Sequence, residues 1–228
     1  MVRSRLYGRV LGLVCLLSLL GAVPGRATDV DLMAFMMSTP GQWNRFSYNV
    51  PSGYPPFTVT VTRLTSGPFA GKLRIGDYRT PDPSKFQWMI MDWDATKMYL
   101  YASSSGTYNP PIKLPRFVPL NILMNHPFEQ GMSWYFKIFP SQKVPAGTFT
   151  DALAWITLDQ QYPPNAVNSQ LGLQGVPGAV TAVDWYVRQV GDLVSWDVDA
   201  ASGNLNFSYQ LAAYGLPNTA SVLDLLLE

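Results

Sequence analysis

The segment from Thr181 to Leu211 places the strongest constraint on the fold, because apolar and polar residues alternate along three runs joined by two turns. The apolar members are Val183, Trp185 and Val187, then Val194, Trp196 and Val198, then Leu205, Phe207, Tyr209 and Leu211. Side chains two positions apart in a strand point to the same face. The pattern predicts three antiparallel strands with one apolar and one polar face, turning at Gly191-Asp192 and over residues 199–204.

Similar runs predict strands along most of the chain: FTVTVTRL, GKLRIGDY, FQWMIMDW, MYLYAS, GMSWYFKIF and VPAGTFTDALAWITLD. The chain has 19 prolines and 18 glycines, which favour turns over helices. We therefore predict a mainly β fold, a curved antiparallel sheet that forms an open barrel or half-barrel. Short helices are expected only near the ends, over Asp29–Met37 and residues 219–228.

A proline-rich segment from Asn109 to Pro127 separates two possible halves, residues 40–108 and 128–215. Proline cannot donate to the ladder of a central strand, so this segment is expected to run extended along an edge or across an open end. Its apolar residues favour a packed crossing; a linker is the alternative. The loop over residues 160–178 is long for a compact domain, which makes it a candidate for function or mobility.

The first 27 residues have the layout of a bacterial secretory signal peptide. Arginines at positions 3, 5 and 9 precede an apolar run over residues 10–23, and Gly25 and Ala27 supply small side chains before the expected cleavage point. The run is shorter than the roughly 20 residues of a spanning helix. We predict that residues 1–27 are removed. Residues 28–228 then form one periplasmic or secreted β domain that is not an integral membrane protein.

Charge and cysteine content exclude several functions. Cys15 is the only cysteine and lies in the predicted signal, so the exported chain has no thiol chemistry. The chain has 16 basic and 15 acidic residues, and four arginines belong to the signal, which leaves a slightly acidic domain. That balance excludes a nucleic-acid partner. No cofactor is expected.

No catalytic constellation is found, so a non-enzymatic protein is expected. His126 is the only histidine, and a hydrolase triad needs a nucleophile beside its base. Two aspartate pairs, Asp92 with Asp94 and Asp197 with Asp199, place carboxyls on the same side of a strand. Both pairs adjoin predicted turns and are interpreted as turn residues. Calcium binding at Asp197 and Asp199, or catalysis by a carboxylate pair, is the alternative.

Two ligand classes are open. An apolar trough on the concave side of the sheet would take a lipid or an apolar segment of another envelope protein. Methionines at positions 33, 36, 37, 89, 91, 98, 124 and 132 suit either a pliable lining or an ordinary core. The alternative is a carbohydrate-binding surface. The candidate ligand-binding residues are Trp93, Tyr101, Trp185 and Trp196.

The chain resembles a group of secreted bacterial β proteins of unassigned function, whose half-barrel domains are similar to the lipoprotein-carrier fold. The segments that carry the resemblance are PGQWNRFSY, PPIKLPRFVPL, FEQGMSW, VPAGTF and DWYVRQVGDLVSWD. They span nearly the whole exported chain. The resemblance implies a curved sheet around a helix or a lipid and an exported location. It implies no enzymatic activity and no catalytic residues.

Overall fold

The structure, a computed structural model, describes residues 29–50, 55–77 and 88–217. The predicted signal peptide and the predicted C-terminal helix lie outside the described residues. Within the described ranges, no helix is both long enough and apolar enough to cross a membrane.

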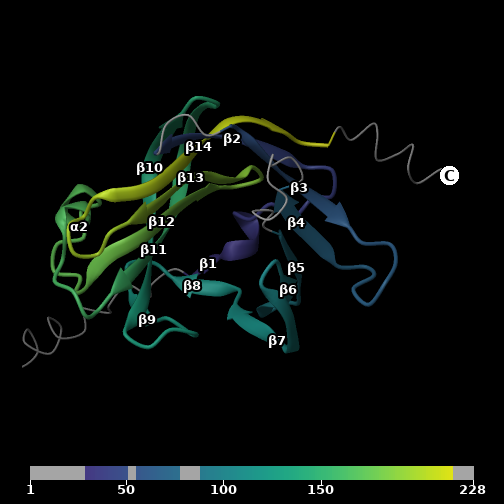
Figure 1. Cartoon of the computed structure of the whole chain (residues 1–228), viewed down its shortest axis with the longest axis horizontal. Helices are drawn as coiled ribbons and strands as arrows, with labels where there is room; N and C mark the ends of the chain where they lie inside the picture. Colours follow the sequence, from purple (N-terminus) through teal and green to yellow (C-terminus); the bar gives the residue numbers. More distant parts are fainter. Residues whose placement is uncertain (1–28, 51–54, 78–87, 218–228) are drawn as a thin grey trace, which may run out of the picture.

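Antiparallel strands dominate the described residues, as predicted (Figure 1). Twelve of these strands form one sheet, in the order β7-β6-β5-β4-β3-β2-β14-β13-β12-β11-β10-β9. Their bounds are β2 Trp43–Val50, β3 Phe57–Arg63, β4 Leu73–Asp77, β5 Trp88–Trp93, β6 Lys97–Ser103, β7 Gly106–Pro115, β9 Leu123–Asn125, β10 Met132–Val144, β11 Gly147–Asp159, β12 Ala179–Val187, β13 Gly191–Val198 and β14 Leu205–Gly215. A second, two-stranded sheet pairs β1, Asp29–Asp31, with β8, Phe117–Pro119. The helices are η1, Leu32–Ala34, and α2, Ala166–Gln170.

Strands that follow one another in the sequence are neighbours in the large sheet, except that β7 and β9 lie at its opposite ends. β2 pairs with β14, so the first strand of the sheet lies beside the last, and Phe46 is opposite Leu211. Buried amide side chains at the start of β2 also bind the turn between β12 and β13. Gln42 Nε2 donates to the carbonyl oxygens of Gln189 and Val190 at 2.8 and 2.9 Å, and Asn44 Nδ2 donates to that of Val190 at 2.9 Å.

The proline-rich segment follows the prediction of an edge position. Pro110, Pro111 and Pro115 lie in β7, which is the outermost strand at one end of the sheet. An edge strand tolerates proline because one side of it needs no backbone donors. The segment then forms β8 and β9 and is packed into the fold: Val118 is fully buried.

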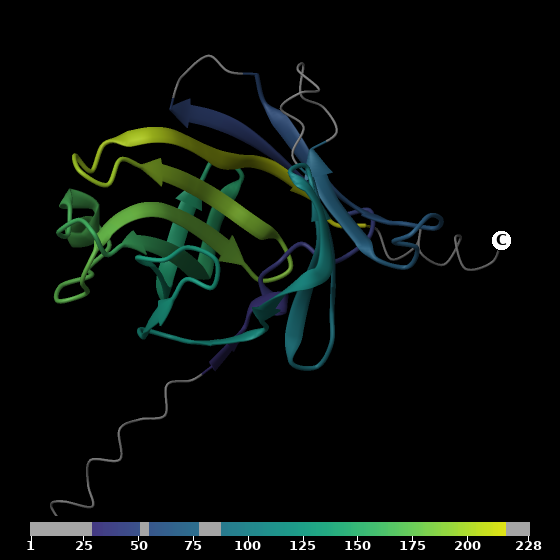
Figure 2. The same ribbon diagram turned by 60° about the horizontal axis from the view of Figure 1, so that its bottom comes forward.

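The sheet bends strongly along its length, and Figure 2 shows its two halves at an angle with the N-terminal segment between them. Register shifts interrupt the pairing of β12 with β13, of β13 with β14 and of β14 with β2. An extra residue on one strand bends that strand and increases its twist. These bulges are the local reason that a long antiparallel sheet curves here.

The N-terminal segment fills the inside of the bend. Leu32 and Phe35 are each 2% exposed and pack with residues of β3 to β6, β10 and β11. The Arg116 guanidinium binds the Asp31 carboxylate at 2.9 and 2.7 Å, which anchors the segment. The prediction of a helix over Asp29–Met37 is wrong except for the single 3-10 turn of η1, because residues 29–31 pair with β8.

A second core lies on the other face of β10 to β13. Ile156, Val183 and Leu193 are fully buried in it, and the segment around α2 covers its end through Val167 and Leu171. Asn168 completes a capping box at the start of α2 and donates to the carbonyl of Gly178 at 2.9 Å. The long loop over residues 160–178 is therefore a packed cover.

The three C-terminal strands form as predicted, but the prediction of one polar face is wrong. Both faces of β12 are covered: Trp185 is 2% exposed in one core, and Tyr186 packs against the other. The predicted turn at Gly191-Asp192 is also shifted, since Gly191 already pairs with Val187 in β13. The predicted apolar face of β14 does not include its first residue, since Leu205 is 38% exposed, whereas Leu211 is fully buried.

Candidate functional site

A cavity of about 320 Å³ lies between the two halves of the sheet. One wall comes from β5, β6 and β7, the opposite wall from β10, β11 and β12, and one side chain comes from the segment after η1. Its lining is mostly sulfur-bearing, aromatic and aliphatic: Met36, Met89, Met91, Met98, Tyr99, Leu100, Leu114, Trp134, Trp155, Thr157, Asp184 and Tyr186. The size falls in the range of small-molecule sites, about 300–1,000 Å³.

The methionine wall follows from strand geometry. Met89 and Met91 are two apart on β5, and Met91 is opposite Leu100 on β6, while Met98 is opposite Leu114 on β7. Met91 and Met98 are 4% and 1% exposed, whereas Met89 is 38% exposed. The wall is thus buried at its centre and open to solvent beside Met89.

The opposite wall is aromatic. Trp155 on β11 meets Trp134 on β10 edge to face, with ring centroids 4.8 Å apart. Tyr186 on β12 lies at 6.5 Å from Trp155. In the strand register Trp155 is directly opposite Asp184. Trp155 and Asp184 therefore share one row across the sheet, with Trp134 and Tyr186 in the flanking rows on the same face.

Burial raises the pKa of Asp184 to about 6, and the Ser195 hydroxyl, directly across on β13, favours the ionised form. On the same face of β13 lies Asp192, whose Oδ2 accepts a hydrogen bond from the Tyr209 hydroxyl at 2.9 Å. Burial and the Asp184 charge raise the pKa of Asp192 well above its usual value. The Oδ1 of Asp192 is buried and has no hydrogen-bond partner among the described residues.

A β-bulge brings these two carboxyls to the same face. Trp185 pairs with Val194 and Tyr186 with Asp192, so Leu193 is the unpaired extra residue of β13. Without the bulge, Asp192 would share the face of Val194. The sequence places Asp192 in a turn, and only the register of the folded sheet shows it inside.

The four sequence-predicted ligand residues lie outside the cavity and do not form one site. Trp185 and Trp196 contact each other edge to face at 4.6 Å and belong to the core on the far side of β12. Trp93 packs partly against the core that surrounds Leu32 and Phe35 inside the bend, and Lys72 Nζ lies 4.0 Å above the Tyr101 ring. None of the four is among the residues that line the cavity.

The predicted aspartate pairs act mainly at turns. Asp94 accepts from the backbone amides of Thr96 and Lys97 at 2.7 and 2.8 Å, and hydrogen bonds from these amides and the Tyr99 hydroxyl hold its pKa well below the usual range. Asp199 accepts from the amide and hydroxyl of Ser202, both at 2.7 Å. Among the described residues, no cluster of three or more His, Cys, Asp or Glu side chains suits a metal ion.

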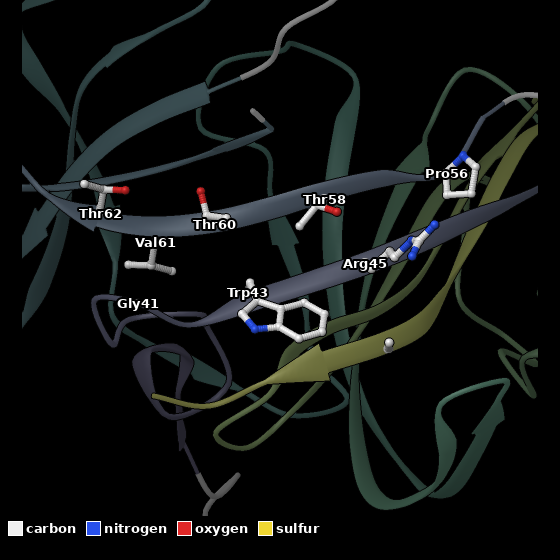
Figure 3. Close-up of a pocket in the computed structure, with 9 residues that line it drawn as sticks. Gly41, Trp43, Arg45, Pro56, Thr58, Thr60, Val61 and Thr62 are labelled. Carbon is white, nitrogen blue, oxygen red and sulfur yellow. The ribbon is translucent and has the colours of Figure 1, made fainter. Parts of the chain in front are cut away.

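A second hollow, of about 850 Å³, lies on the outer face of β2 and β3 (Figure 3). Trp43 is opposite Thr60, and Arg45 is opposite Thr58. Thr62 extends the same row. The Trp43 indole lies against Gly215 so closely that a Cβ there would overlap it, which fixes the ring while leaving it 38% exposed.

No protein-family model matches the chain, and no curated protein matches it. Two solved structures are distantly similar. A predicted lipoprotein from Parabacteroides distasonis is 12% identical, with 80% of this chain and 99% of that chain covered, at a TM-score of 0.39. A predicted exported protein with a YmcC-like fold from Bacteroides fragilis is 9% identical, with the same coverage and a TM-score of 0.37.

Proposed function

We propose that the chain is an exported, non-enzymatic binding protein of half-barrel shape, which holds a small apolar ligand in the methionine-lined cavity. The observation that carries the proposal is the cavity of about 320 Å³ between the two halves of the sheet. Its methionines suit such a role because unbranched thioether side chains adapt to irregular shapes. The signal-like first 27 residues motivate the exported location.

The fold limits the size of the ligand. Residues of the N-terminal segment, among them Leu32, Phe35 and Met37, are buried in the bend of the sheet. They occupy the apolar trough that the sequence offered to a long acyl chain. The space left is the cavity beside Met36, with an opening at Met89. A compact apolar molecule fits this space better than an extended lipid.

The test uses the protein purified without detergent. Mass spectrometry is expected to show a co-purified small molecule, and the fluorescent probe N-phenyl-1-naphthylamine is expected to bind with micromolar affinity. Met89→Trp fills the mouth of the cavity and is expected to weaken probe binding about tenfold or more, a difference of about 1.4 kcal/mol. Leu205→Trp is the control, because Leu205 is also 38% exposed but lies on β14, away from the cavity. A clean mass spectrum together with no probe binding contradicts the proposal.

The outer hollow supports a second candidate function, carbohydrate binding at β2 and β3. A partly exposed, fixed indole beside a row of threonine hydroxyls and Arg45 suits stacking and hydrogen bonding to a sugar ring. Trp43→Ala is expected to abolish binding on a glycan array, whereas Phe128→Ala, which removes an aromatic ring 53% exposed, leaves it unchanged. A blank array with the unaltered protein removes this candidate.

A further inference from the structure

The apolar cavity contains one carboxyl group. Of the described residues that line it, Asp184 alone is acidic, and none is basic. The pKa of about 6 means that the group is largely ionised near neutral pH. A negative charge therefore lies in the wall of a cavity otherwise made of thioethers, rings and aliphatic groups.

The groups around Asp184 do not neutralise this charge. Asp192 on β13 is a second acid and supplies no positive charge, and burial and the Asp184 charge raise its pKa well above the usual value. Tyr186 on β12 and Tyr209 on β14 stay neutral, since burial raises their pKa values well above the ordinary one. Desolvation and the Ser195 hydrogen bond are the causes of the Asp184 shift, and neither is a cation.

Two basic side chains of neighbouring elements, Arg188 and Lys72, have other contacts. The Arg188 guanidinium lies 4.6 Å from the Phe35 ring centroid. Lys72 forms an ion pair with Asp92 at 3.2 Å. A carboxylate in a poorly hydrated site is costly unless a cation accompanies it. The charge balance of the cavity thus favours a ligand that brings a positive charge.

Aromatic rings complete a site of this kind. Trp155, opposite Asp184 in the register, meets Trp134 at 4.8 Å and Tyr186 at 6.5 Å, and all three rings line the cavity. The faces of such rings attract cations, and the attraction is largest for weakly hydrated ones such as quaternary ammonium groups. The same carboxylate repels a fatty acid anion.

We infer that the cavity binds a cationic amphiphile, with an ammonium group between Asp184 and the aromatic wall and an apolar remainder among the methionines. This inference rests on the proposed function and specifies the ligand class of the same site. It narrows the expectation of a lipid, because the carboxylate head of a fatty acid would meet Asp184.

The test compares three probes that share an eight-carbon chain: octyltrimethylammonium, octanol and octanoate. Calorimetric titration of the full exported chain at about pH 7.5 is expected to show the ammonium compound binding about tenfold or more tightly than octanol, with octanoate weakest. Asp184→Asn is expected to remove the preference for the ammonium compound and to keep octanol binding. Asp197→Asn is the matched control, because Asp197 is exposed on β13, away from the cavity.

A pH series adds a readout that does not depend on a variant. Octyltrimethylammonium has no titrating group, so its affinity reports the charge of Asp184. From about pH 7.5 to about pH 5 the affinity is expected to fall about tenfold, while octanol binding stays constant. Octanol or octanoate binding as tightly as the ammonium compound at pH 7.5 overturns this inference and leaves the proposed function standing. Failure of all three probes, together with N-phenyl-1-naphthylamine, overturns both.

Discussion

Replacing Asp184 with asparagine is expected to stabilise the protein at pH 8 by on the order of 2 kcal/mol. The pKa of Asp184 rises from 3.8 to about 6 on folding, so the folded state binds its proton more tightly than the unfolded state. Between these two pH values the folded chain holds more protons, and the free energy of unfolding falls as the pH rises. Above about pH 7 the loss of unfolding free energy caused by ionised Asp184 is constant, and below about pH 3.5 it is absent. Urea unfolding across this pH range measures it.

Asp197→Asn is again the control for Asp184→Asn. The side chain of Asp197 is exposed and accepts a hydrogen bond from Asn206 Nδ2 at 3.0 Å, so its replacement is expected to leave the unfolding free energy within about 0.5 kcal/mol at every pH. Equal unfolding free energies for the Asp184→Asn variant and the unaltered protein at pH 8 contradict the assignment of a buried, costly charge.

The second large effect is expected at Gly191, where alanine should destabilise the fold by about 3 kcal/mol. The backbone there has φ of 88°, which L side chains rarely adopt. An added Cβ would overlap the Cγ of Met37 and lie 3.1 Å from the Met37 backbone nitrogen. The N-terminal segment can then no longer approach the start of β13. Chemical denaturation at neutral pH measures the loss.

Two controls separate the causes of the Gly191 effect. Gly71 has φ of 84° with open space where a Cβ would stand, so Gly71→Ala isolates the backbone cost of about 1 kcal/mol. Met37→Ala removes the overlapping Cγ, so the double variant with Gly191→Ala is expected to be less destabilised than the sum of the single changes. Additive effects, or equal losses at Gly71 and Gly191, show that close packing of Met37 on Gly191 is not the cause.

Much of the strand architecture is predictable because it depends on local pattern. The alternation of Trp134, Phe136 and Ile138 with polar neighbours predicts β10. All three side chains pack in the core inside the bend of the sheet. The prolines of residues 109–127 predict an edge strand, which β7 is. Both features depend only on side-chain period and on the missing proline donor.

The features that the sequence does not predict depend on register and on distant partners. Asp184 and Tyr186 occupy the polar positions of a half-buried strand, and the core on their side of β12 is built from distant residues of η1 and β3 to β6. Asp192 turns inward only because Leu193 is an unpaired bulge residue. The sequence identifies Met36, Met89, Met91 and Met98 as residues that could line a binding site. They line one cavity only because the sheet bends and brings distant strands together.

The seam between β2 and β14 makes the two halves of the sheet depend on the full length of the chain. The hydrogen bonds from the Gln42 and Asn44 side chains to the turn between β12 and β13 also join residues 146 to 148 positions apart. Contacts of such long range form only after a large loss of chain entropy, so they form late and slowly. A chain emerging from a ribosome or a translocon can build hairpins at once, but it has no continuous sheet, and no cavity, until its last strand is released.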